Sequence, residues 1–170
     1  IEDITGALAL AAKRPVRMEL RRTEEFTQAR SRHAQVLWMK TGATKDGTLV
    51  ANELRVVADT GAYGGHAVTV QANTGSHPLP LYPAENIRFH CKIAYTNLPS
   101  AGAMRGYGTP QGIFAVENQM DEMAERLGMD PLEFRGMACI KKDQDDPISR
   151  VLSEGKKAAR KVLDDGLTEA

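Results

Sequence analysis

Two runs of alternating apolar and polar residues flank an Asp-Gly pair, and this pattern constrains the fold more than any other feature of the chain. The runs read HAQVLWMKTGA and LVANELRVVADTGAY. Alternation with a period of two is typical of half-buried strands, and Asp46-Gly47 between the runs is a hairpin signal. The sequence therefore predicts an antiparallel strand pair at 33–42 and 48–60.

Other strands and helices are expected on both sides of this pair. Period-two patterns predict further strands, whereas apolar residues on one face and capping residues predict helices. These expected elements are strands at 15–22 and 86–96, and helices at 4–13, 23–26, 109–128 and 131–137. In the longest helix Thr109 is expected as the N-cap, Pro110 as the first helical residue and Gly128 as the stop.

The order of these elements indicates the fold class. Strands and helices are interleaved without regular βαβ alternation, so we expect an α+β fold with a mixed or antiparallel sheet and helices packed on one face. Residues 61–83 are rich in Gly and Pro and are expected to be irregular and functional. We expect residues 1–140 to form one domain, followed by a linker and C-terminal helix at 141–170.

Composition excludes several classes of function. Lys plus Arg number 22 and Asp plus Glu number 22, so no net charge favours nucleic acid or an anionic membrane as a partner. No apolar run is long enough to span a membrane. Cys91 and Cys139 form no CxxC pair, so we expect no metal or iron–sulfur site in this chain. The missing initiator Met suggests a piece of a longer protein. We expect that protein to be cytoplasmic.

The segment AGAMRGYGTPQ, at 101–111, has the composition of a binding site. Gly106 and Gly108 allow positive φ and a close approach of the backbone to a ligand. Arg105 offers a charged fork suited to phosphate or carboxylate, and Tyr107 offers a flat apolar face. A helix that begins beside Gln111 would present free N–H groups to an anion. A plain turn into a helix explains the same residues equally well.

Several segments together resemble the xanthine dehydrogenase/aldehyde oxidase family, the molybdenum hydroxylases. TNLPSAGAMRGYGTPQGIFAVENQMDEMA resembles the family's RGFGxPQ segment, RPVRMELRRTEEF resembles one of its strands, and WMKTGATKDGTLVANELRVVADTGAYG resembles its hairpin. The similarity is collinear over about residues 4–140 and is strongest to bacterial members of the xanthine dehydrogenase type. It implies that the chain is the first half of a molybdopterin-binding large subunit.

The resemblance also implies roles for individual residues. Arg105, Gly106 and Gln111 match the part of the family motif that lies against the molybdenum cofactor, and Tyr107 matches the aromatic residue that stacks on a planar substrate. Such enzymes hydroxylate a heteroaromatic or aldehyde carbon with water as the oxygen source. The cofactor is molybdenum-molybdopterin, in some members as the cytosine dinucleotide, and iron–sulfur clusters and FAD lie on other domains or subunits. The motif assigns no role to the Tyr107 hydroxyl.

The chain departs from the family pattern at informative places. The GGGFG segment and the Glu that acts as base in the family are absent, so we expect no catalytic residue in this chain. Asn73 stands in ungapped register where xanthine-oxidising members have an Arg; we expect it to contact substrate, and purine specificity is not indicated. No Cys lies in the loop, unlike the carbon-monoxide-oxidising branch.

Alternatives remain open from the residues alone. The chain could be a non-catalytic scaffold or subunit-interaction domain that retains the fold; a nucleotide-binding module is weaker, because no phosphate-loop motif is present. Glu117 is more consistent with a structural hydrogen bond than with a supporting role at a site. His66 and His77 show no metal-ligand spacing and are expected to have ordinary polar roles. Cys91 is expected to be a buried thiol.

Overall fold

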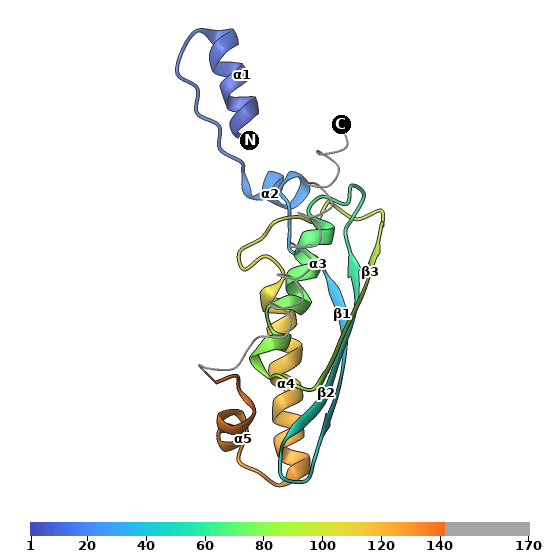
Figure 1. Ribbon diagram of the computed structural model, residues 1–170. Helices are drawn as coiled ribbons and strands as arrows, with labels where there is room; N and C mark the ends of the chain where they lie inside the picture. Colours follow the sequence, from blue (N-terminus) through green and yellow to red (C-terminus); the bar gives the residue numbers. More distant parts are fainter. Residues whose placement is uncertain (142–170) are drawn as a thin grey trace, which may run out of the picture.

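A computed structural model describes residues 1–141 of the chain. Nine elements follow one another along these residues, as Figure 1 shows. They are α1 (Glu2–Ala12), α2 (Arg22–Gln28), β1 (Gln35–Ala43), β2 (Leu49–Asp59), α3 (Ala67–Ser76), the 3-10 turn η1 (Leu79–Leu81), β3 (Asn86–Ala94), α4 (Thr109–Leu127) and α5 (Pro131–Ala138). The C-terminal helix expected within 141–170 lies outside the described residues.

The three strands form one mixed sheet in the order β1-β2-β3. β1 and β2 are antiparallel and are joined at the predicted Asp46-Gly47 turn, where Gly47 has a φ of 89°. β3 runs parallel to β2, so that Trp38, Arg55 and His90 lie in register across the sheet. The expected α+β class with a mixed sheet is confirmed.

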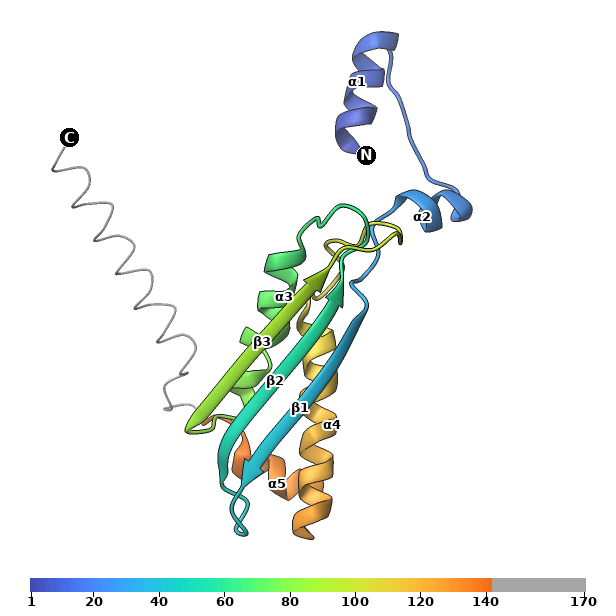
Figure 2. The same cartoon turned by 90° about the vertical axis from the view of Figure 1, so that its right-hand side faces the viewer.

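Helices α3, α4 and α5 lie on one face of the sheet, as was expected, and within residues 1–141 no element covers the other face (Figure 2). The core between these layers contains Leu54 and Val56 from β2 with Met120 from α4 and Phe134 from α5. The apolar stripe predicted for α4 supplies this core, except that Ile113 is 36% exposed. Burial of this stripe holds the long helix against the sheet.

The strand expected at 15–22 is absent. Residues 15–21 form no strand in the structure, and α2 begins at Arg22. The alternation of Val16, Met18 and Leu20 is real, but a strand exists only where a neighbour completes its hydrogen bonds. Within the described part of the chain no such neighbour is present, and α1 stands apart from the sheet in both views (Figures 1 and 2).

The expectation that residues 61–83 are irregular is also wrong, because α3 and η1 occupy most of this stretch. Val68, Thr69 and Val70 are β-branched and have low helix propensity, which conceals the helix in the sequence. Packing overrides this propensity: a Cβ at Gly112 of α4 would lie only 2.0 Å from the Thr74 carbonyl oxygen, so the two helices approach closely through a glycine.

The predicted ends of α4 are correct to within one residue. Gly108, rather than Thr109, is the N-cap, and Gly128 ends the helix in the left-handed conformation with φ 70°. Asp130 caps α5 by accepting hydrogen bonds from the backbone N–H groups of Leu132 and Glu133. Among the described residues, no helix is long and apolar enough to cross a membrane.

Candidate functional site at the start of α4

The loop before α4 has an unusual backbone. Gly106, Tyr107 and Gly108 have φ values of 85°, 46° and 99°, three consecutive residues in the left-handed region. A non-glycine residue there is uncommon and persists only where its surroundings fix it. A Cβ at Gly108 would lie 2.0 Å from the carbonyl oxygen of Val70 on α3. The glycine therefore lets the loop rest directly on α3.

Polar side chains of α3 hold this loop from one side. The Tyr107 hydroxyl lies 2.6 Å from His66 Nδ1 and 2.7 Å from Thr69 Oγ1. At the other end of α3, His77 Nδ1 lies 2.7 Å from Thr109 Oγ1. Asn73 lies between these contacts, because Thr69, Asn73 and His77 recur every four residues on one helix face. The structure thus brings Asn73 to the face of α3 that meets the loop.

A buried hydrogen-bond chain connects the loop to the sheet. The Thr74 hydroxyl on α3 lies 3.2 Å from the carbonyl oxygen of Gly108 and can donate to it. The same hydroxyl accepts from Gln35 Nε2 on β1 at 3.1 Å, and Gln35 also donates to Gln71 Oε1 at 2.5 Å. Because Thr74 and Gln71 are almost fully buried, this series of hydrogen bonds fixes the position of the loop relative to the sheet.

The segment before β1 holds the loop from the opposite side. Arg32 donates to the carbonyl oxygen of Arg105 at 2.5 Å and to Gln111 Oε1 at 3.3 Å. Gln111 in turn donates to the carbonyl oxygen of His33 at 3.3 Å. Both the oxygen and the nitrogen of the Gln111 side chain are therefore bonded to the protein itself. The backbone N–H of Gln111 has no acceptor among the described residues and is left for a ligand.

The base of the loop is fixed by Asp59 at the end of β2. Its carboxylate accepts hydrogen bonds of 2.7 Å from the Gly61 N–H and from Thr96 Oγ1. These two donors, the Gly61 N–H first, hold the pKa of Asp59 below its ordinary value of 3.8. The carbonyl oxygen of Asp59 accepts from the buried His33 ring. Asp59 thereby joins the ends of β2 and β3 to the segment that carries Arg32.

Free hydrogen-bond donors collect at this end of α4. The exposed Arg105 side chain makes no hydrogen bond or ion pair with any residue that the structure describes. In the same part of the chain the backbone N–H groups of Gly106, Gly108 and Gln111 have no acceptor. A helix N-terminus also carries partial positive charge. This donor set fits a large anionic cofactor with many acceptor oxygens, such as a pterin phosphate, and it contains no metal ligands.

Residues 1–141 contain no cluster of side chains with the composition of a metal site. Groups of three or more His, Cys, Asp or Glu that could hold a metal ion are absent there. Glu117 has the structural role that its position in α4 suggested: it accepts from Tyr82 at 2.8 Å and pairs with Arg135 at 2.8 Å. Burial, followed by the hydrogen bond to Glu117, raises the pKa of Tyr82 to about 12.

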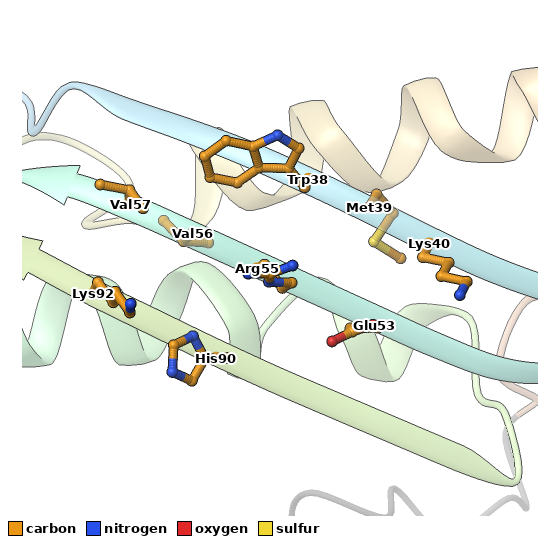
Figure 3. A pocket seen from close by; sticks show the side chains of 9 residues that line it. All are labelled: Trp38, Met39, Lys40, Glu53, Arg55, Val56, Val57, His90 and Lys92. Carbon is orange, nitrogen blue, oxygen red and sulfur yellow. The ribbon is translucent and has the colours of Figure 1, made fainter.

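The open face of the sheet carries a second concavity (Figure 3). Trp38 is 53% exposed there, above Arg55 and His90. Four cationic side chains on this face have no ion-pair partner within residues 1–141: Lys40, Arg55, Arg88 and Lys92. Burial raises the pKa of Cys91, whose half-buried side chain alternates toward the helix-covered face. The concavity shares no lining residue with the loop 105–108.

The sequence indicated the loop and Asn73, but it gave no role in supporting the loop to His66, Thr69, His77 or Arg32. His66, Thr69, Asn73 and His77 are spaced as a polar stripe on a helix, and this spacing is a signal that the glycines and prolines of 61–83 concealed. Arg32 gives no local signal, because it reaches the loop across 73 positions of sequence. The expectation of ordinary polar roles for the two histidines is met in that both bind hydroxyl groups, yet both hydroxyls belong to the loop or to the start of α4.

Known proteins are similar to this chain in sequence and in fold. A family model of the molybdopterin cofactor-binding domain matches residues 1–139. The putative xanthine dehydrogenase molybdenum-binding subunit XdhA of Escherichia coli (strain K12) is 41% identical over 143 residues, 83% of this chain and 19% of that protein. The nicotinate dehydrogenase large molybdopterin subunit of Eubacterium barkeri is 41% identical over 128 residues, 75% of this chain and 30% of that protein.

A solved structure gives the same result for the fold. The aldehyde oxidoreductase of Desulfovibrio gigas superimposes with a TM-score of 0.72 at 30% identity, over 96% of this chain and 19% of that chain. The chain thus spans about a fifth of the length of the first relatives that it matches.

Proposed function

Because this chain belongs to the molybdopterin cofactor-binding domain family, we propose that it is part of the molybdenum-cofactor-binding subunit of an oxidoreductase. The complete enzyme hydroxylates a carbon of a heteroaromatic ring or an aldehyde, with water as the oxygen source. The observation that carries this proposal is the set of unpaired donors at the start of α4, within the motif that resembles the family's cofactor loop.

Arg105, Gly106 and Gln111 are the proposed cofactor-binding residues. The guanidinium of Arg105 binds an oxyanion of the cofactor, while Gly106 and Gln111 contribute backbone N–H groups. The bound cofactor supplies the redox chemistry of the hydroxylation. The chain's own residues bind and orient: Arg32 holds the carbonyl oxygen of Arg105, so the loop keeps one shape before a ligand arrives.

Tyr107 and Asn73 are the proposed substrate-binding residues. The ring of Tyr107 is half-buried on a loop whose backbone is fixed by two glycines, which suits stacking on a flat substrate. The Asn73 side chain forms no hydrogen bond with the residues described, so its amide is available to a polar substituent. The base that accepts a proton from water is a Glu elsewhere in the longer protein, and no Glu of this chain is assigned that role.

The other parts of the enzyme lie outside this chain. We assign residues 1–140 to the first part of the cofactor-binding domain and 141–170 to a linker and helix. Partners are the remainder of the molybdopterin-binding subunit and the iron–sulfur and FAD domains or subunits; the cofactor is molybdenum-molybdopterin, in its plain or cytosine dinucleotide form. The free thiols of Cys91 and Cys139 support a cytoplasmic location, where thiols stay reduced.

The open sheet face supports a partner within the same polypeptide. Trp38 and Val36 are more than half exposed beside unpaired cations, and the relatives extend far beyond the matched region. An exposed apolar patch of this kind marks an interaction surface. We propose that an acidic segment from the remainder of the subunit covers it.

The first prediction tests Arg105 in the full-length protein. Arg105→Ala should weaken cofactor binding by about 10- to 100-fold, because an oxyanion loses a charge-assisted hydrogen bond. Molybdenum content per protein, measured by mass spectrometry of the metal after dialysis, should fall accordingly. Turnover should be assayed with xanthine, nicotinate, quinoline and benzaldehyde as probes.

Arg126→Ala is the matched control, because Arg126 lies at the other end of the same helix in an exposed pair with Glu122. It should retain both molybdenum and turnover. Equal molybdenum in the Arg105→Ala variant and the wild type would contradict the cofactor assignment. A wild-type protein that binds no molybdenum and oxidises none of the four probes would instead support the scaffold alternative.

A further inference from the structure

The hydroxyl of Tyr107 is the centre of a closed hydrogen-bond ring with α3. It lies 2.6 Å from His66 Nδ1 and 2.7 Å from Thr69 Oγ1, and Thr69 Oγ1 also lies 3.1 Å from the His66 carbonyl oxygen. The His66 and Tyr107 rings meet edge to face at 85° with centroids 5.7 Å apart. The aromatic ring is thus held at its far end as well as through its backbone.

A donor and an acceptor can be assigned to each contact of the hydrogen-bond ring. The Thr69 hydroxyl proton goes to the His66 carbonyl oxygen, so Thr69 Oγ1 accepts from Tyr107, and the Tyr107 oxygen accepts from His66 Nδ1. This assignment leaves no donor unpaired.

Both ends of the contact occupy a costly backbone conformation. His66 has φ 58° at the N-cap of α3, and Tyr107 has φ 46° in the loop. A non-glycine residue in this conformation is strained, and the conformation persists only where other contacts impose it. Two such residues that bind each other through their side chains indicate that the position of the Tyr107 ring is imposed.

We propose that His66 is a positioning residue: with Thr69 it fixes the position of the Tyr107 hydroxyl, while its edge-to-face contact restrains the tilt of the Tyr107 ring, and together these contacts set the orientation of a planar substrate. The proposal rests on the proposed function, in which Tyr107 stacks on that substrate. A phenylalanine at position 107 would stack equally well but could not be locked. The hydroxyl of Tyr107 therefore has a role of its own, in addition to the stacking that the ring provides.

The test uses four variants in the full-length protein at matched molybdenum content. Tyr107→Phe removes the hydroxyl, Thr69→Val removes one partner, and His66→Gly removes the other without straining the left-handed backbone. His66→Asn is the rescue variant, because Asn tolerates φ > 0 and its amide can donate from a comparable position. We expect each of the first three to lower kcat/KM for the best heteroaromatic probe by about tenfold, since misoriented substrate reacts slowly. His66→Asn should stay within about twofold of the wild type.

The double variant and a control separate positioning from general damage. His66→Gly with Tyr107→Phe should be no worse than either alone, because the two changes break the same contact. Arg126→Ala, whose exposed pair with Glu122 lies at the far end of α4 from the loop, is the control and should leave kcat/KM unchanged. Multiplicative losses in the double variant, or wild-type kinetics of Tyr107→Phe, overturn the lock.

Crystal structures of the same full-length variants give a readout that needs no turnover. The Tyr107 ring should occupy one orientation in the wild type and in His66→Asn, and several orientations in His66→Gly and Thr69→Val. A single unchanged orientation in His66→Gly refutes the lock even if the enzyme is active. An ordered ring that depends on His66 in a protein without hydroxylase activity supports the lock and rejects the proposed function.

Discussion

At the scale of single residues, Asp59 shows how a charge fixes the base of the candidate site. The pKa of its carboxyl is held low by the Gly61 N–H and then by the Thr96 hydroxyl. A group with a lowered folded-state pKa stabilises the fold above its unfolded pKa, and this contribution disappears as the pH falls through the folded pKa. The carboxylate therefore contributes at neutral pH and loses its effect below about pH 4.

Asp59→Asn should reduce stability at pH 7 by about 1 kcal/mol, because neutral hydrogen bonds replace charge-assisted ones while the acceptor remains. Thermal unfolding of the full-length protein should show a lower Tm for the variant at pH 7. The difference in Tm should persist down to about pH 4 and shrink below it, as the wild-type carboxylate becomes protonated. A difference in Tm that does not change below about pH 4 would rule out the charge as the cause.

At the scale of elements, α5 is attached to α4 through Arg135. Its guanidinium pairs with Glu117 at 2.8 Å and Asp121 at 2.6 Å, and it also donates to the Glu117 carbonyl oxygen at 3.1 Å. Glu117 in addition accepts from Tyr82 beyond η1. The partly buried carboxylate of Glu117 therefore joins three segments. These contacts explain why a charged residue lies beside the apolar stripe of α4.

Glu117→Gln should reduce the free energy of unfolding by about 1–3 kcal/mol, because a partly buried guanidinium loses one of its two ionic partners. Glu122→Gln is the matched control on the same helix: its pair with Arg126 is exposed, at 3.5 Å, and should contribute about 0.5 kcal/mol or less. Urea unfolding followed by circular dichroism measures both. Equal losses in the two variants would mean that the Glu117 contacts have no special weight.

At the scale of the whole molecule, two surfaces are the ones that we propose other parts of a longer protein complete. One is the donor-rich loop at the start of α4, which presents one side of the proposed binding site. The other is the open sheet face, where Trp38 and Val36 are 53% and 56% exposed. A cofactor bound by several segments of a longer protein is held weakly by one of them, since binding energy depends on all contacts together.

The 170-residue chain expressed alone should therefore purify without molybdenum and without hydroxylase activity. It should also self-associate through the open sheet face, because exposed apolar area favours association. Metal analysis and light scattering measure the two properties. Molybdenum near one equivalent per chain would show that this chain alone holds the cofactor and would refute the prediction.

The sequence by itself determined the elements whose causes are local. The alternation around Asp46-Gly47 specifies β1 and β2, and Pro110 and Gly128 delimit α4 because their backbone preferences act within a few residues. Arg105 and the glycines beside Tyr107 marked the candidate loop for the same reason: glycine permits positive φ wherever it stands. The α+β class and the packing of helices on one face of the sheet followed from these patterns.

Tertiary structure alone decided the features that depend on distant partners. The alternating residues of 15–21 form no strand because a ladder needs a neighbour, whereas the β-branched residues of α3 form a helix because Gly108 and Gly112 bring the loop and α4 against it. The contacts of Tyr107 with His66 and of Arg105 with Arg32 span 41 and 73 positions. No periodicity of the sequence encodes such pairs, since hydrogen bonds between side chains far apart in the chain depend on where the packed elements place them.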